Sequence, residues 1–192
     1  MVEYTTQPIG KRSKRVLDYY AMTTAARQRG TFFLAGLLFF LSGAASLAYE
    51  VVWVKLLTLQ FGSAAWSITT VVASFMAGLG AGGAWAGRRA DRIARPLKAY
   101  GLLELGIALY GALSVPLLEN MAGLLNPLYG LVDSAFWAYM LAQFLLSVLM
   151  LAVPTFLMGA SLPLLIVAVS QQGTFRRSVA LFYGINTLGA AA

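Results

Sequence analysis

The sequence predicts an all-α integral membrane protein with about five transmembrane helices. Apolar residues make up 59% of its 192 residues and charged residues only 11%, and the mean hydropathy is +0.74. In soluble domains, charged residues account for about a quarter of the chain. One helical crossing needs about 20 apolar residues, so the sequence has room for roughly five or six crossings. It has no room for a separate soluble domain of ordinary size.

The first 30 residues form a basic segment with six Lys and Arg residues, two acidic residues and no apolar run of spanning length. We predict a cytoplasmic tail over residues 1–30. A solvated tail and an interfacial helix are both compatible with the composition; in the helix, Tyr19, Tyr20 and Met22 would touch lipid headgroups. The apolar run that follows is too long for the core of a signal peptide and is predicted to be a retained first span.

The rest of the chain, residues 31–192, is predicted to be one transmembrane helical domain. Its spans are expected at about residues 31–58, 63–87, 97–118, 134–170 and 178–192. The fourth stretch is longer than one crossing needs, and we predict a single tilted span bent at Pro154 and Pro163. A span followed by a re-entrant segment is the alternative. The fifth run is shorter than a crossing and is predicted to be an incomplete helix.

The distribution of basic residues predicts the orientation. With a cytoplasmic N-terminus, every Lys and Arg except Lys55 falls on the cytoplasmic side, in the tail, in the loop over residues 88–98 and at Arg176 and Arg177. Basic residues concentrate on the cytoplasmic side of membrane proteins. The net charge of +7 therefore indicates topology, and we predict no nucleic-acid partner.

The residue types exclude several kinds of chemistry. The chain contains no cysteine and no histidine, which excludes thiolate nucleophiles, disulfides and the usual zinc ligand sets. We predict no metal site and no cofactor. A G-x-G-x-x-G string over residues 78–83 matches the dinucleotide fingerprint, but it lies inside an uncharged span rather than at a strand-to-helix turn.

The same glycines predict helix packing. Gly78 with Gly82, and Gly83 with Gly87, form small-xxx-small pairs. Such pairs let the backbone of a second helix approach closely in lipid. We therefore predict that this face of the second span packs against another helix.

Two acidic residues, Glu50 and Glu104, lie within predicted spans. An ionisable group in this position is costly and usually faces a cavity, a partner charge or a substrate. Either residue can bind a cation or carry a proton. The alternatives are a buried neutral acid and, for Glu50, a pair with Lys55 near the outer boundary.

Further polar and aromatic residues extend this candidate substrate path. Tyr49 and Trp53 lie one turn apart and offer ring faces to an organic cation, although they can equally be interface anchors. Ser67, Thr70 and Gln143 belong to weakly polar helix faces. Packing of the helices through local hydrogen bonds is the alternative role for these faces.

The loop after the second span carries a charged motif, Gly87-Arg-Arg-Ala-Asp91-Arg92-Ile-Ala-Arg95-Pro-Leu-Lys98. It resembles the signature between the second and third helices of the major facilitator superfamily. Gly87, Asp91, Arg92 and Arg95 match this signature, whereas the leucine, the second glycine and the last basic residue of the signature are replaced. We expect a conformational latch, in which Asp91 pairs with arginines and with helix N-termini of a neighbouring bundle.

Several separated segments narrow the resemblance. Residues 39–57, 75–82, 102–106, 154–163 and 183–189 are similar to the N-terminal membrane region of bacterial fused major facilitator/spermidine synthase proteins. The resemblance implies the first part of a six-helix facilitator half. It also implies a following soluble domain that transfers an aminopropyl group from decarboxylated S-adenosylmethionine to putrescine. No residue of this chain can be assigned to that reaction.

These observations predict the membrane module of a spermidine-synthase-like protein in the bacterial inner membrane. The module would anchor the enzyme and transport a polyamine or a related cationic metabolite. The alternatives are a non-transporting scaffold that packs through residues 78–87, and a half-size facilitator-type transporter that acts as a dimer. The expected partners are the lipid bilayer and other membrane helices, from a C-terminal continuation of the chain, a second copy or another subunit.

Overall fold

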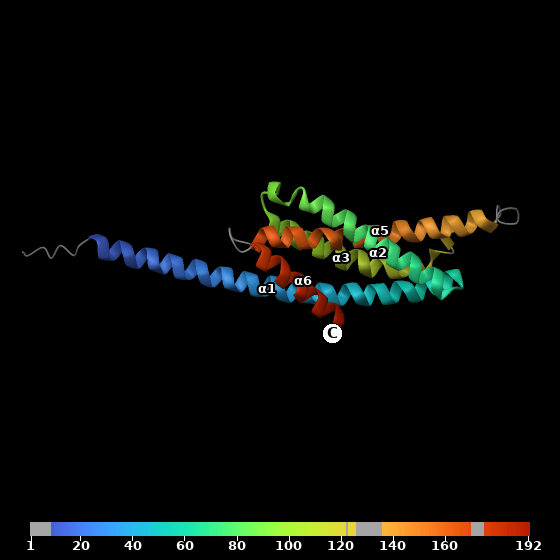
Figure 1. Ribbon diagram of the computed structural model, residues 1–192, viewed down its shortest axis with the longest axis horizontal. Coiled ribbons are helices and arrows are strands. Elements are labelled where there is room, and N and C mark those ends of the chain that lie inside the picture. The colour runs from blue at the N-terminus through green and yellow to red at the C-terminus, as the bar shows by residue number, and fades with distance from the viewer. Residues whose placement is uncertain (1–8, 122, 126–135, 170–174) are drawn as a thin grey trace, which may run out of the picture. The chain divides into compact units, whose positions relative to one another are not determined.

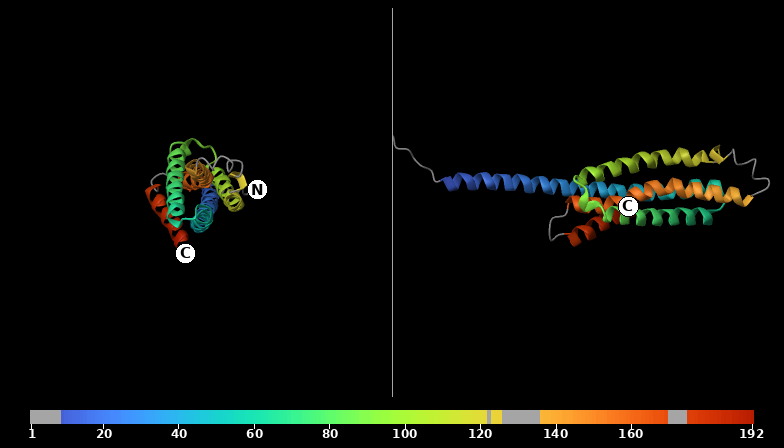
Figure 2. Two further views of the ribbon diagram at one scale, coloured as in Figure 1. Left: turned by 90° about the vertical axis from the view of Figure 1, so that its right-hand side faces the viewer. Right: turned by 90° about the horizontal axis from the view of Figure 1, so that it is seen from above.

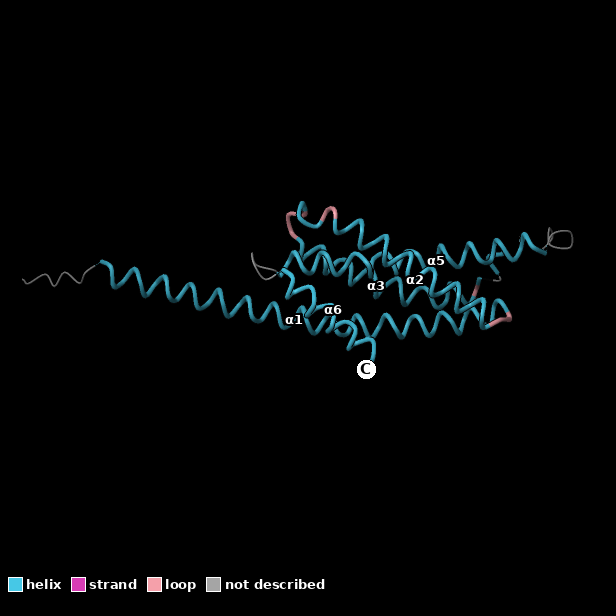
Figure 3. The backbone as a smooth tube through the Cα atoms, in the orientation of Figure 1, coloured by secondary structure: helices cyan, strands magenta, loops and turns pink. Residues whose placement is uncertain are grey.

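The computed structural model describes residues 9–121, 123–125, 136–169 and 175–192 (Figure 1). The elements are α1 (Ile9–Phe61), α2 (Ala64–Gly87), the short 3-10 helix η1 (Ala90–Arg92), α3 (Pro96–Glu119), α5 (Phe136–Val169) and α6 (Phe175–Ala191). Across these ranges the backbone forms helices joined by short turns and contains no strand (Figure 3). The predicted all-α class is confirmed for this part of the chain.

Four of these helices are long and apolar enough to cross a membrane. They are Gly30–Phe61 within α1, the whole of α2, the whole of α3, and Trp137–Val169 within α5. They coincide with the first four predicted spans, and they indicate a membrane protein in a lipid bilayer. α6 has 17 residues and is shorter than a crossing. The fifth crossing, and with it the count of five, stays a prediction.

α5 is one continuous helix that contains both Pro154 and Pro163. The region predicted over residues 134–170 is therefore helical without interruption from Phe136 to Val169, with no re-entrant segment in this range. Residues 134, 135 and 170 lie outside the described residues.

The chain divides into two compact units, Met1–Leu38 and Phe39–Ala192. In the first unit the backbone is helical from Ile9 onward, and the side chains of Tyr19 and Met22 are exposed. The described part of the segment predicted as a tail is thus a helix. Its position at the membrane surface stays a prediction, and residues 1–8 and the side chain of Tyr20 lie outside the described residues.

In the second unit, the turn between α1 and α2 depends on one glycine. Gly62 has a φ of +66°, and its N–H donates to the carbonyl of Thr58, 3.0 Å away. This is the left-handed conformation that commonly ends a helix and that glycine adopts without steric cost. Ser63 follows in an extended conformation and starts α2. The chain reverses direction within two residues.

Residues at the two ends of α3 explain where this helix begins and ends. Pro96 occupies the first turn, where its missing N–H costs nothing and its φ suits the helix. At the other end, the side-chain amide of Asn120 donates to the carbonyl of Pro116, 2.8 Å away. This bond satisfies one of the carbonyls that a helix end leaves free.

The contacts between helices show that the four spans alternate in direction. Along α1 and α3, Tyr49 lies against Gly111, Trp53 against Ser114, and Gln60 against Leu118, so these two helices run in parallel. α2 and α5 also run in parallel, since the glycines of α2 meet α5 in the same order (Figure 2). Alternating directions are the topology expected of four successive membrane crossings.

A buried cluster joins α1, α2, α3 and α5. Its largest members are Trp53, Leu57, Phe75, Leu118 and Leu151. Large apolar side chains are also exposed on every span, for example Leu105 and Leu109 on α3 and Leu149 on α5. In water such a surface would be costly, whereas in a bilayer it faces lipid tails.

Candidate functional site

The candidate site lies around Glu104, eight residues into α3. The side chain is half-buried, and its Oε1 is fully buried without a hydrogen-bond partner in the described part of the protein. No Lys or Arg forms an ion pair with it there. A buried polar atom without a partner is unusual, because the loss of its hydration is not compensated.

Two hydroxyl groups lie near this carboxylate. Ser42 on α1 and Tyr100 on α3 face the carboxylate of Glu104. Tyr100 precedes Glu104 by four residues, which places both on one face of the helix. Tyr100 is only 2% exposed, and its hydroxyl also lacks a hydrogen-bond partner. We call Ser42, Tyr100 and Glu104 the acidic cluster.

Aromatic rings hold one side of the acidic cluster. The ring of Phe39 on α1 makes edge-to-face contacts with Tyr100, at 6.4 Å between centroids, and with Phe182 on α6, at 6.3 Å. Phe39 and Phe182 are buried. The edge-to-face geometry is a favourable one for aromatic pairs. These contacts fix the tyrosine ring and exclude water from that side.

α6 is attached to α1 next to this cluster. The side-chain amide of Asn186 donates to the carbonyl of Phe39, 3.0 Å away. Gly43 and Gly189 allow the close approach, because a Cβ on Gly43 would overlap the backbone of Asn186 and a Cβ on Gly189 would overlap the backbone of Phe40. α6 therefore contributes to the surroundings of the acidic cluster, although it is shorter than a span.

The second candidate carboxylate, Glu50, lies in a different environment. Its side chain is half-buried on α1, and no described contact links it to Glu104. No ion pair with Lys55 is seen in this part of the chain, and Lys55 is exposed. The structure therefore does not bring the two predicted carboxylates into one site.

Tyr49 and Trp53 stack on each other, with centroids 5.7 Å apart and ring planes 13° apart. Trp53 is fully buried, and its Nε1–H donates to Oγ of Ser114, 2.8 Å away. The Tyr49 ring occupies the space left by the missing side chain of Gly111. Both rings fill the interface between α1 and α3, and Trp53 has no exposed surface with which to anchor at a lipid interface.

The remaining path candidates are buried and do not meet Glu104. The hydroxyls of Ser67 and Thr70 each donate to a carbonyl four residues earlier on α2, at 2.8 Å. Gln143 on α5 donates to the carbonyl of Gln60, 3.1 Å away. Gln60 in turn binds the carbonyl of Leu118, which lies about 20 Å further along α3 than Glu104 at 1.5 Å per residue.

The predicted packing glycines differ in their surroundings. A Cβ on Gly78 would overlap Thr155, and one on Gly82 would overlap the backbone of Phe156. Gly83 has the carbonyl of Gly159 at 3.5 Å from its Cβ position, and Gly87 has open space. The close contact with α5 therefore rests on Gly78 and Gly82, whereas Gly87 is exposed at the end of α2.

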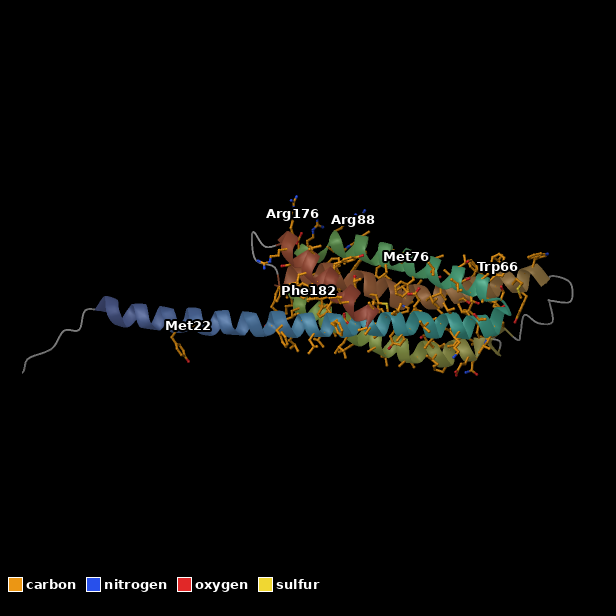
Figure 4. All side chains as sticks on the ribbon, turned by 60° about the horizontal axis from the view of Figure 1, so that its bottom comes forward. Met22, Trp66, Met76, Arg88, Arg176 and Phe182 are labelled. Carbon is orange, nitrogen blue, oxygen red and sulfur yellow. The ribbon has the colours of Figure 1, made fainter. Side chains whose placement is uncertain are left out.

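The charged motif lies in the loop between α2 and α3. Arg89 places its guanidinium 5.3 Å from the ring centroid of Trp85, in a cation–π contact. Asp91, Arg92 and Arg95 are exposed, and Asp91 forms no ion pair within the described ranges. Arg88 and Arg176 lie at the same end of the bundle, and Trp66 lies toward the other end (Figure 4). The predicted latch has no partner in this part of the chain.

Comparisons with protein-family models, with curated proteins and with solved structures find no match to this chain. Among the described residues, no group of three acidic side chains is placed to hold a metal ion. The acidic cluster is therefore assessed on its own chemistry. It offers four oxygen atoms, two from hydroxyl groups and two from one carboxylate, in an environment of low polarity, which suits a small cation or a proton.

Tyr100 was not among the residues that we selected from the sequence. A tyrosine within an apolar run resembles an interface anchor. The available signal was its spacing of four residues from Glu104, which places a hydroxyl beside the carboxylate on any helix. Ser42 lies on α1, and only the packing of α1 against α3 brings it to Glu104.

Proposed function

We propose that this chain is the membrane module of a spermidine-synthase-like protein and that it binds and transports a polyamine or a related cationic metabolite. One observation supports transport over anchoring alone: Glu104 lies within a membrane span and has a buried oxygen without a partner. An anchor has no need of such a group, because an apolar side chain at this position would cost less free energy within the membrane.

The resemblance of the sequence to fused major facilitator/spermidine synthase proteins supports the remainder of the proposal. We place the module in the bacterial inner membrane with its N-terminus in the cytoplasm. The α2–α3 loop and the start of α6 carry basic residues at one end of the bundle. This asymmetry supports the orientation, since basic loops are retained in the cytoplasm.

Uptake by proteoliposomes tests the proposal. The full chain is reconstituted, and the uptake of labelled putrescine is compared for wild type, Glu104→Gln and Glu50→Gln. Glutamine keeps the size of the side chain and removes its charge. We expect Glu104→Gln to abolish most uptake and Glu50→Gln, the matched control, to retain it. Equal uptake by all three proteins would refute a role for the carboxylate.

The same preparation distinguishes the alternatives. A dimer with uptake, detected by crosslinking in mild detergent, would support a half-size transporter. No uptake together with stoichiometric capture of another membrane subunit would support a scaffold. Such a scaffold would have to use a face other than Gly78 and Gly82, because α5 of the same chain covers these glycines.

A further inference from the structure

We infer that the acidic cluster is a binding site for a primary ammonium group, and that Ser42 and Tyr100 determine its specificity for N–H donors. This inference rests on the proposed function, since it specifies the chemical group of the cargo that the site binds. Beyond Glu104, Ser42 and Tyr100 then contact the cargo, and its N–H donors distinguish a primary ammonium group from other cations.

The acidic cluster contains buried oxygens that can accept hydrogen bonds. Tyr100 Oη and Glu104 Oε1 are both buried, both lack a partner, and lie one helical turn apart. The hydroxyl of Ser42 faces the same carboxylate from α1. The Ser42 and Tyr100 hydroxyls can donate one hydrogen bond each to the carboxylate, but the four oxygens of the cluster have more acceptor sites than these two donors can fill. Further donors are expected, because nearly all buried polar atoms in folded proteins are paired.

The cluster contains one carboxylate, and no Lys or Arg of the described residues pairs with it. A carboxylate within a span is most stable beside a cation that also satisfies its lone pairs. A primary ammonium group provides one positive charge and three N–H donors, which complement the negative charge of the carboxylate and the four oxygen acceptors of the cluster.

The number of N–H donors distinguishes a primary ammonium group from other cations. A quaternary ammonium carries the same charge but donates no hydrogen bond, so it would leave the Tyr100 and Glu104 oxygens without partners. An inorganic ion such as Na⁺ usually takes more oxygen ligands than the four that the cluster offers, and it donates no hydrogen bond to them. Phe39 and Phe182 form an apolar wall behind Tyr100, which suits the alkyl chain of an amine.

Calorimetric titration of the purified full chain in detergent tests the inference independently of transport. The probes are n-butylammonium, n-butyltrimethylammonium and NaCl at the same ionic strength. We expect wild type to bind n-butylammonium at least tenfold more tightly than the trimethyl analogue, because hydrogen bonds to a charged group are lost. Equal affinity for both amines, or no binding of n-butylammonium, would overturn the inference.

Two conservative variants locate the site. Tyr100→Phe removes only the hydroxyl, and Ser42→Ala only the Oγ atom; each is expected to weaken n-butylammonium about tenfold and to leave the trimethyl analogue unchanged. Tyr110→Phe, a half-buried tyrosine on the same helix, is the matched control. Unchanged affinity in Tyr100→Phe would remove the tyrosine from the site.

Selective binding without putrescine uptake would refute the proposed transport and keep the site. Putrescine uptake without selective binding of n-butylammonium would refute the ammonium site and keep the proposed transport.

Discussion

The indole nitrogen of Trp53 donates a hydrogen bond to Oγ of Ser114 across the α1–α3 interface, with a donor–acceptor distance of 2.8 Å. The serine hydroxyl in turn donates to the carbonyl of Gly111, 2.7 Å away. Trp53 and Ser114 are both buried. This pair connects two parallel helices at a point where neither group can turn to water.

The first prediction concerns this hydrogen bond. Ser114→Ala removes the acceptor and leaves the Trp53 N–H buried without a partner, which should lower the free energy of unfolding by about 1–3 kcal/mol. Trp53→Phe should also destabilise, through lost packing. In a double-mutant cycle measured by denaturant unfolding in detergent micelles, we expect a coupling of about 1 kcal/mol between the two positions. Strict additivity would show that the bond contributes nothing.

The second prediction concerns the α2–α5 contact. Gly82→Leu places a side chain where the backbone of Phe156 lies, and should destabilise the protein by about 1–3 kcal/mol or more through overpacking. Gly80→Leu on the same helix is the control, because nothing lies within 4 Å of its Cβ position. Thermal unfolding in detergent should show a lower midpoint for Gly82→Leu only. Equal shifts in both variants would argue against this contact.

The third prediction concerns Gln143. Its amide nitrogen bonds the carbonyl of Gln60, but its Oε1 is buried without a partner. Gln143→Leu loses one hydrogen bond and also removes the unpartnered oxygen, so the free energy of unfolding should change by less than about 1 kcal/mol. Gln60→Leu removes the donor to the carbonyls of Leu118 and Glu119 and should destabilise more. If denaturant unfolding showed a larger loss of stability for Gln143→Leu than for Gln60→Leu, these hydrogen-bond roles would be contradicted.

The fourth prediction concerns orientation. The sequence has no cysteine, so single cysteines can be introduced without a background. Ala64→Cys lies at the α1–α2 turn and Arg92→Cys in the α2–α3 loop, and both positions are exposed. With intact cells, a membrane-impermeant maleimide should label position 64, and position 92 only after permeabilisation. Labelling of position 92 in intact cells, and of position 64 only after permeabilisation, would show the opposite orientation.

The spans were predictable because length and charge define them. The second span is predicted over residues 63–87, where the structure has the helix Ala64–Gly87, and the third over 97–118, where it has the helix Pro96–Glu119. Arg88 and Pro96 mark these boundaries in the sequence itself. In contrast, the basic composition of the N-terminal segment does not separate a helix from a solvated tail, so the start of α1 at Ile9 was not predictable.

The site was predictable only in part. An acidic residue within an apolar run is visible in any sequence, and Glu50 and Glu104 are equally conspicuous. Their surroundings differ because Tyr100 lies one turn before Glu104 on α3, and because the packing of α1 on α3 brings Ser42 to Glu104 through contacts distant in sequence. For the same reason, the sequence suggested that Trp53 offers a ring face to an organic cation or anchors at the interface, whereas it bonds Ser114, which lies 61 residues away.

The glycine contacts of α2 with α5 also bear on motion. At Gly78, Gly82 and Gly159 the two helices touch through backbone atoms and small groups, which have no rotamers to change. The α1–α3 interface is instead filled by the larger rings of Tyr49 and Trp53. If the bundle rocks during a transport cycle, we expect α2 and α5 to move as one rigid body, with the adjustment taken up where side chains can rearrange.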